Sequence, residues 1–468
     1  MDEILTWEAR AQAASIAAGE VSAEALMQAT LARIAEVNPR LNAVVSLQDE
    51  GVLLAEAKAA DNRTPEGPLH GLPIAIKDLA DAKGLPTSHG SPSLAGQVAA
   101  RDSLHVARLR AAGAIMIGKT NTPEFGLGSH TYNPVHGVTC NPYDGARTCG
   151  GSSGGAAVAL ASGMLSIADG SDMMGSLRNP AGWCNVYGMR PTWGLVPATP
   201  EGESVLHPIS TNGPMARSPG DLALLLGIMG GPEVRQPYGR VVPDLDLRGG
   251  AKGARIAWLA DWGGAFPYEG GIAPLCEAAL AVLTEQGAEV EPLAAPFDRD
   301  LLWHSWTTLR SWAMAAQLGP LLEAPETRDQ LKPEAVWEIE RGRTLSALEV
   351  HKASEIRSEW FRVAAGLFES YDALALPTAQ VWPFPVEWEW PREVAGHAMD
   401  SYHRWMEVMV PASLAGLPAV AMPAGFGENG LPMGVQLIGP RGGDGVLLRL
   451  AQAYHDATHW PGRRPAET

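Results

Sequence analysis

The stretch GGSSGGAAVALASGMLSIADGSDMMGSLR, at residues 150–178, decides which fold we expect for this chain. Two Gly/Ser loops, at 150–155 and 169–176, enclose an Ala-rich segment and the short apolar run 165–168. Alanine favours helix, and a short apolar run bounded by turn residues is typical of a buried strand. The stretch therefore predicts a helix over 156–161 followed by a strand, with a glycine-rich loop on either side.

The same alternation of strand and helix continues outward along the chain. The apolar run GLPIAIKD at 71–78 predicts a buried strand that ends with Lys77 and Asp78. An amphipathic helix over 102–112 and a second buried strand over 114–117 follow it. Further helices are expected at 6–18, 22–37, 221–229 and 272–286, and further strands at 254–259 and 289–293. This pattern predicts an α/β fold with a central mixed, largely parallel sheet flanked by helices.

The chain of 468 residues contains no tandem repeat and no low-complexity linker, so we expect a single domain over 1–468. We divide it into a helical N-terminal region over 1–60, a core over 71–195 and a Trp-rich, helix-biased region within 296–400. Residues 377–396 carry many Pro and Trp residues and predict an irregular loop.

Composition limits the partners that the protein can have. The 52 acidic residues outnumber the 35 basic residues and give a formal net charge of −17. A nucleic-acid backbone or an anionic membrane is repelled by such a protein, so we expect neither as a partner.

The first residues lack the basic and apolar regions of a signal peptide, and the apolar part of the uncharged stretch 148–168 is too short to cross about 30 Å of hydrocarbon. Four cysteines without CxxC spacing indicate free thiols and a cytoplasmic protein.

No metal or cofactor is expected from the sequence. His455 and His459 are four residues apart, but no Glu completes an HExxH motif, so a structural pair is the better interpretation. The loop at 150–155 lacks the Gly-Lys-Ser/Thr ending of a nucleotide-binding P-loop.

Taken alone, the reactive residues of this chain have ordinary structural explanations. Lys77 fits a strand-end lysine, the Gly/Ser loop fits a flexible connector, and Ser176 fits a helix cap. The loop also contains G-x-S-x-G, which would make Ser153 the nucleophile of an α/β-hydrolase esterase with a downstream His such as His403. The order in which the motifs occur favours a different interpretation.

Several segments occur together in the order of a known signature. They are Gly71–Asp78, Gly150–Gly155, Asp172–Arg178 with Pro180-Ala181, Gly188–Gly194, Gly213–Ser218 with Asp221, Gly416–Ala419 and Gly430–Gln436. In residues and order they resemble the amidase signature family, and the resemblance covers most of the chain. It implies the amidase signature fold, with 71–195 as the catalytic core and 296–400 as a variable region that shapes the substrate site.

The resemblance also implies a mechanism. It makes Ser176 the nucleophile that forms an acyl-enzyme, Ser152 a bridging serine held by a cis peptide bond, and Lys77 the base, with Ser153 supporting the relay. A lysine has a reference pKa of about 10.4 and accepts a proton near pH 7 only if burial keeps it neutral. This Ser-cisSer-Lys triad needs no histidine.

The backbone around the nucleophile has an implied role as well. The N–H groups of Met173, Met174, Gly175 and Ser176 are the expected oxyanion hole. The family motif has Gly-Gly before the nucleophile, whereas this chain has Met174-Gly175, and a residue with a Cβ adopts positive φ less freely. The two methionines are therefore also candidates for shaping the acyl pocket. Asp172 and Arg178 match framework positions, so we expect them to hold the loop.

The resemblance predicts hydrolysis of a carboxylic amide, and composition suggests which kind. Seven tryptophans either line an apolar cleft or pack in the core: Trp303, Trp306, Trp312, Trp337, Trp382, Trp388 and Trp390. A cleft of this kind favours small apolar or aryl amides, anilides or carbamates (urethanes), cleaved by a monomer or homodimer. The alternatives are a glutaminase subunit of a tRNA-dependent amidotransferase, the esterase that uses Ser153, and a non-catalytic α/β binding protein.

Overall fold

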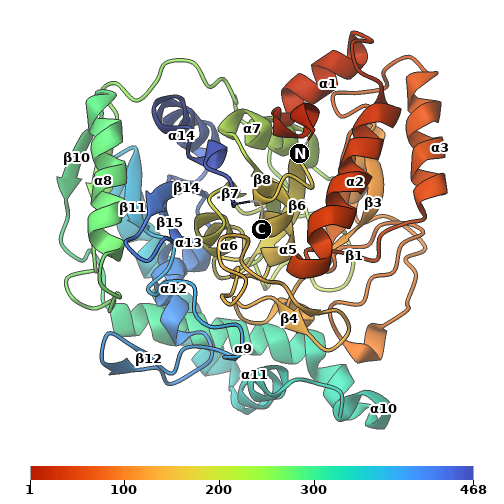
Figure 1. Ribbon diagram of the computed structural model, residues 1–468. Coiled ribbons are helices and arrows are strands. Elements are labelled where there is room, and N and C mark those ends of the chain that lie inside the picture. The colour runs from red at the N-terminus through yellow and green to blue at the C-terminus, as the bar shows by residue number, and fades with distance from the viewer. Residues whose placement is uncertain (1, 467–468) are drawn as a thin grey trace.

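The computed structural model describes residues 2–466 and contains two principal β-sheets of unequal size (Figure 1). The larger sheet has eight strands in the order β10-β9-β11-β15-β14-β7-β8-β6, and the smaller has three in the order β1-β3-β2. The strands of the larger sheet are β6 (Ile167–Asp172), β7 (Tyr187–Arg190), β8 (Thr211–Ala216), β9 (Arg255–Trp258), β10 (Glu289–Pro292), β11 (Ala373–Pro377), β14 (Ala419–Phe426) and β15 (Pro432–Ile438). Those of the smaller sheet are β1 (Val44–Val45), β2 (Pro73–Lys77) and β3 (Ile115–Thr120). Two short hairpins complete the strands: β4 (Tyr132–Asn133) with β5 (Gly137–Val138), and β12 (Glu393–Val394) with β13 (His397–Ala398).

Helices surround both sheets and fill most of the remaining chain (Figure 1). They are α1 (Ala9–Ala17), α2 (Ala23–Leu41), α3 (Glu50–Asp61), α4 (Leu104–Ala111), α5 (Gly154–Ala161), α6 (Arg178–Trp183), α7 (Pro219–Met229), α8 (Ile272–Glu285), α9 (Arg299–Glu323), α10 (Pro325–Arg328), α11 (Pro333–Thr344), α12 (Ala347–Leu367), α13 (Val410–Ala415) and α14 (Asp444–Thr458). Each helix and strand named in the sequence analysis is present, with its ends moved by a few residues. The α/β fold with one large mixed sheet is confirmed.

The proportion of parallel pairing in the large sheet differs from our expectation. Only β10-β9 and β9-β11 pair in parallel, while the five pairs from β11-β15 to β8-β6 are antiparallel. The β9-α8-β10 crossover joins two directly paired strands, but from β11 to β6 other strands are inserted between the strands that run in the same direction. β6 and β7 run in the same direction, for example, with the antiparallel β8 between them. "Largely parallel" was therefore wrong for this sheet, because strand order depends on contacts remote in sequence.

The strand that carries Lys77 belongs to the smaller sheet. β2 pairs in parallel with β3, as the strand-helix-strand order of 71–117 predicts, and β1 pairs with β3 on its other side. All five residues of β2 are buried, which explains its continuous apolar run. β2 also packs against β6 of the large sheet, so the two sheets meet where the second Gly/Ser loop begins.

The region after β10 forms a helical layer along the lower edge of the molecule in Figure 1. The Asp298 side chain accepts a hydrogen bond from the N–H of Leu301 at 2.9 Å and so caps the first turn of α9. α9 is 25 residues long and packs against α11 and α12. The loop predicted at 377–396 is mostly irregular.

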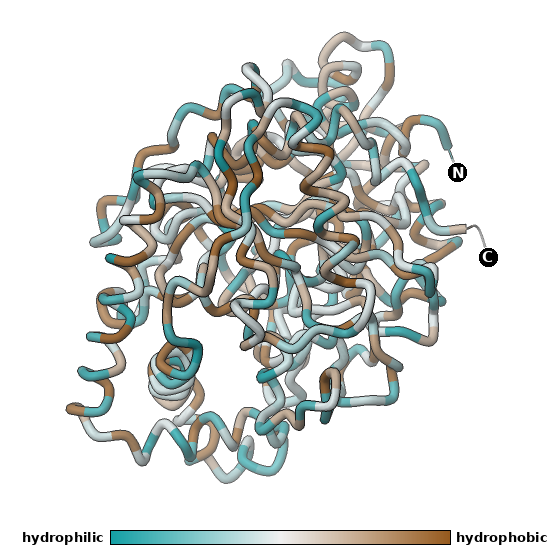
Figure 2. The backbone as a smooth tube through the Cα atoms, turned by 90° about the vertical axis from the view of Figure 1, so that its left-hand side faces the viewer, coloured by the Kyte–Doolittle hydropathy of each residue, from teal (hydrophilic) through white to brown (hydrophobic). Residues whose placement is uncertain are grey.

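The core passes through the middle of the molecule, where brown segments gather in Figure 2 and teal segments lie mainly at the periphery. Cys140, Cys149, Cys184 and Cys276 are free thiols, as the spacing predicted. No helix among residues 2–466 combines the length and apolar character needed to cross a membrane.

Candidate active site

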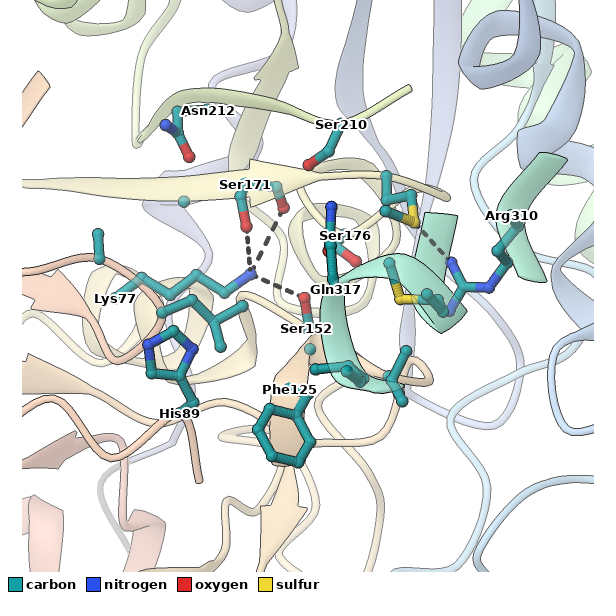
Figure 3. A pocket seen from close by; sticks show the side chains of 18 of the residues that line it. Lys77, His89, Phe125, Ser152, Ser171, Ser176, Ser210, Asn212, Arg310 and Gln317 are labelled. Carbon is teal, nitrogen blue, oxygen red and sulfur yellow. Dashed lines mark hydrogen bonds between the residues drawn. The ribbon is translucent and has the colours of Figure 1, made fainter. Parts of the chain in front are cut away.

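A cavity of about 410 Å³ opens where β2, β6, the first Gly/Ser loop and α9 meet (Figure 3). One part of its lining is polar: Lys77, His89, Ser152, Ser171, Ser176, Ser210, Asn212, Arg310 and Gln317. Another part is apolar: Leu79, Phe125, Leu127, Met173, Met314 and Leu318. The three residues of the predicted triad therefore line one cavity.

Lys77 lies among three serine hydroxyls. Its Nζ is 2.7 Å from Ser152 Oγ, 2.9 Å from Ser153 Oγ and 3.0 Å from Ser171 Oγ. In Figure 3 the lysine side chain extends along the cavity toward Ser152 and Ser171. Ser171, on β6, was not among the residues expected from the sequence, although it lies within the segment 150–178.

Burial makes Lys77 suitable as a base. The side chain is 1% exposed, and burial lowers its pKa to about 7, although the negative charges of Asp169 and Asp172 oppose this change. A large part of the lysine population is therefore neutral near pH 7 and able to accept a proton.

The first Gly/Ser loop holds Ser152 beside this lysine. The peptide bond between Gly151 and Ser152 is cis, as the resemblance implied. Ser129 Oγ donates to the carbonyl of Gly151 at 2.6 Å and accepts from its N–H at 3.1 Å. The backbone next to Ser152 is thus fixed by hydrogen bonds.

Ser176 lies at the start of the turn that leads into α6. Its carbonyl accepts a hydrogen bond from the N–H of Ser153 at 3.2 Å, which ties the two Gly/Ser loops together. The Ser176 side chain is 8% exposed and faces the cavity, and its hydroxyl has no hydrogen-bond partner among residues 2–466. The structure therefore joins Lys77, Ser152 and Ser153 by hydrogen bonds but does not join Ser152 Oγ to Ser176 Oγ.

Asp172 organises the nucleophile turn. Its carboxylate accepts from the N–H groups of Gly175 (2.9 Å) and Leu177 (3.2 Å), and it contacts the guanidinium groups of Arg178 and Arg190. Burial opposes ionisation of this carboxyl, but the two arginines and the hydrogen bonds outweigh it and hold the pKa of Asp172 below its usual range. The expectation that Asp172 and Arg178 hold the loop is consistent with these contacts.

The same contacts change the expected oxyanion hole. The N–H of Gly175 is directed to Asp172, whereas the N–H groups of Met173, Met174 and Ser176 have no acceptor within the described chain. Positive φ occurs at Gly175 (87°) and not at Met174, so the methionine in place of glycine meets no backbone strain. Three donors are therefore available rather than four.

One face of α9 forms the side of the cavity opposite Lys77. Arg310, Met314, Gln317 and Leu318 recur at helical spacing and line it together. Arg310 donates to Glu338 Oε1 at 2.7 Å and to Tyr402 Oη at 2.7 Å, so its charge is paired. This spacing was visible in the sequence, but nothing in the sequence identified which face of the helix meets the site.

The tryptophans do not line this cavity, and the apolar lining comes from Leu, Met and Phe instead. Trp306 and Trp303 are buried in the core, Trp337 packs against Tyr402, and Trp388 is 51% exposed. Of the two roles left open for the tryptophans, core packing accounts for most of these residues. Of the two methionines, Met173 lines the cavity, while Met174 is buried in the core.

A series of polar contacts runs from Asn212, which lines the cavity, to the backbone of Lys77. Asp169 Oδ1 accepts from the Lys77 N–H at 2.9 Å, and Asp169 Oδ2 is 3.1 Å from His105 Nε2. His105 Nδ1 in turn lies 3.3 Å from Asn212 Nδ2, on β8. No sequence pattern indicated these contacts, because His105, Asp169 and Asn212 are far apart along the chain.

The esterase alternative lacks its base. Among residues 2–466, Ser153 Oγ forms hydrogen bonds only with Lys77 and the backbone of Ser171, and with no histidine. His403 is fully buried and stacks on Tyr402 at 4.5 Å between ring centroids.

His455 contacts Tyr187 and packs on His459, which agrees with a structural pair. Within the described residues, no group of three or more His, Cys, Asp or Glu side chains is arranged to hold a metal.

Known proteins resemble this chain over nearly its whole length. Residues 25–448 match the family model described as Amidase. An acylamidase of Rhodococcus erythropolis is 31% identical over 100% of this chain and 99% of its own length. A glutamyl-tRNA(Gln) amidotransferase subunit from Chloroflexus aggregans is 34% identical, with 96% of each chain covered. The crystal structure of a bacterial aryl acylamidase of the amidase signature family superposes with a TM-score of 0.90 at 27% identity, covering 98% of this chain and 99% of that one.

Proposed function

The chain belongs to the amidase family, whose members cleave amide C–N bonds, and from this premise we propose that it hydrolyses small apolar or aryl amides, anilides or carbamates through Ser176. The observation that carries this proposal is the position of Ser152 Oγ, 2.7 Å from the Nζ of the buried Lys77, in the cavity that Ser176 also faces.

The hydrogen bonds around Lys77 suit a base. A neutral amine has two N–H donors and one lone pair. Ser153 Oγ is 3.3 Å from the carbonyl of Ser171, to which it can donate, and so it is free to accept from Lys77. With Ser171 Oγ as the second acceptor, the lone pair of the amine faces the hydroxyl of Ser152.

We propose the following reaction. Ser176 Oγ attacks the carbonyl carbon, its proton passes to Ser152 Oγ, and the proton of Ser152 passes to Lys77 Nζ. The N–H groups of Met173, Met174 and Ser176 stabilise the oxyanion. The C–N bond then breaks as the relay returns one proton to the departing amine, and water releases the acid from Ser176 by the same steps.

This route requires one small movement. The Ser176 hydroxyl must turn toward Ser152 Oγ when substrate fills the cavity, because the two hydroxyls are not bonded to each other in the structure. Catalytic hydrogen bonds often close only in the substrate complex.

The lining of the active-site cavity favours neutral substrates. The lining from Phe125, Leu127, Met314 and Leu318 is apolar, and Arg310 is already paired with Glu338. A free charged group, such as the α-carboxylate of glutamine, finds no unpaired cation among the described lining residues apart from Lys77. The resemblance to acylamidases supports the same substrate class.

A direct comparison of purified enzyme on acetanilide, an aryl carbamate, a short aliphatic amide and glutamine tests the substrate class. We expect the aryl substrates to have the highest kcat/KM and glutamine the lowest. A wide preference for glutamine would overturn the proposal in favour of the amidotransferase role, for which relatives at 34% identity exist.

Free thiols and the acidic charge support our placing the protein in the cytoplasm, without a nucleic-acid or membrane partner.

A further inference from the structure

A second cavity, of about 370 Å³, shares no lining residue with the active-site cavity. Four of its residues lie on one side of α12, and Leu414, Ala415 and Gly416 come from the end of α13. Val205 and Pro208 also line it, while Ser210 and Asn212 face the active-site cavity, so the segment 205–212 contributes to both. We refer to this second cavity as the α12 pocket.

The α12 pocket is strongly basic in an otherwise acidic protein. Arg357, Arg362 and Arg441 line it, and its lining includes no Asp or Glu. Within residues 2–466 none of the three guanidinium groups has a hydrogen bond or an ion pair. Two other partly buried arginines, Arg240 and Arg449, are likewise unpaired among residues 2–466, whereas Arg299 lies 2.7 Å from Glu407.

Arg357 is the member of this group that most needs a partner. Its side chain is half-buried, and burial lowers the pKa of Arg357, with only Tyr238 nearby to oppose that change. A partly desolvated guanidinium without an anion is unfavourable, so a pocket in which Arg357 lies with the exposed Arg362 and Arg441 is suited to a negatively charged ligand.

The rest of the α12 pocket is aromatic and well supported. The rings of Trp193 and Tyr238 pack with centroids 4.9 Å apart, and Phe361 lies on the helix between Arg357 and Arg362. The backbone N–H of Trp193 donates to the carbonyl of Gly416 at 3.1 Å, which ties the backbone at Trp193 to the end of α13. Flat apolar surface therefore lies beside the unpaired charges.

We propose that the α12 pocket binds a small aromatic carboxylate. A carboxylate matches the planar fork of a guanidinium, and an aryl ring packs favourably on Trp, Tyr and Phe. The volume accommodates one such molecule. The proposal does not depend on the chemistry assigned to Ser176.

Isothermal titration of the full chain with benzoate tests this proposal. We expect saturable binding that weakens about tenfold or more in Arg357→Gln, because one charge-assisted hydrogen-bonding group is lost. Arg441→Gln and Arg362→Gln should weaken it as well, and these two side chains are exposed, so their replacement leaves the packing intact. The matched control is Arg248→Gln, an exposed arginine outside the pocket, which should bind as the wild type does.

Two further probes, one without a charge and one without a ring, separate the contribution of the arginines from that of the aromatic rings. Benzamide keeps the ring but lacks the charge, and inorganic phosphate keeps the charge but lacks the ring, so both should bind more weakly than benzoate. The proposal is wrong if benzoate does not bind, if Arg357→Gln binds it as tightly as the wild type, or if benzamide or phosphate binds equally well. Unchanged binding in Arg357→Gln would place benzoate in the active-site cavity or elsewhere.

Discussion

The two sides of the active-site cavity are built in different ways. One side, which we call the floor, consists of Lys77, Ser152, Ser171 and Ser176 on strand ends and Gly/Ser loops. The hydroxyls of Ser152 and Ser171 lie 2.7 and 3.0 Å from the Lys77 amine. The opposite side, the wall, consists of Arg310, Met314, Gln317 and Leu318 on α9. Most floor positions are fixed by hydrogen bonds, whereas the wall presents side chains of which only Arg310 is strongly tethered. We propose that the floor carries the chemistry and that the wall selects the substrate.

The largest expected effect is on the floor, from Ser176→Ala. The variant cannot form the acyl-enzyme, so we expect kcat on an anilide to fall by about 10⁴-fold or more. Steady-state kinetics with thermal unfolding as a check on folding measure this. Ser210→Ala, which removes a hydroxyl from the same cavity, should retain most of the activity. Equal losses in the two variants would contradict a special role for Ser176.

A smaller loss is expected when the base is replaced. Lys77→Met introduces an apolar side chain of similar length that cannot exchange protons, so the rate on an amide should fall by roughly 10²–10⁴-fold. A matched activated ester should lose less, because its leaving group departs without protonation. Parallel kinetics on the ester and the amide give the ratio. The same loss for both substrates would mean that Lys77 does not return a proton to the amine.

The pH dependence offers a finer test of the floor. Only neutral Lys77 accepts a proton, and its pKa is about 7, so kcat/KM should rise about tenfold from pH 6 to pH 8. The negative charge of Asp169 raises the pKa of Lys77, and removing that charge should therefore lower the pKa and shift the rising limb to lower pH. Asp169→Asn makes this change while keeping an oxygen that can accept from the Lys77 N–H. An activity that falls between pH 6 and pH 8 would contradict the role of a neutral lysine.

The smallest effect is expected on the wall. Leu318→Ala removes apolar surface from the cavity, so we expect kcat/KM for an aryl anilide to fall about fivefold while a short aliphatic amide changes little. Leu321→Ala, on the same helix but outside the cavity lining, is the control. If Leu318→Ala reduced kcat on both substrates as strongly as a floor variant does, the division between the two sides would be wrong.

The same division explains what the sequence could and could not predict. Lys77, Ser152 and Ser176 lie in short motifs whose glycines and order identify them, and the structure places all three around one cavity. The wall depends on which face of α9 meets the floor, and the pairing of Arg310 with Glu338 spans 28 residues. The direction of pairing in the large sheet and the burial of the tryptophans likewise depend on long-range packing. Local composition contains no information about such contacts.

The most direct test of the account is labelling with a fluorophosphonate followed by peptide mapping. We expect one covalent label on Ser176, with a labelling rate that falls sharply in Lys77→Met because the serine is no longer activated. A label on Ser153, or no label on a folded and active protein, would contradict the assignment of Ser176 as the nucleophile.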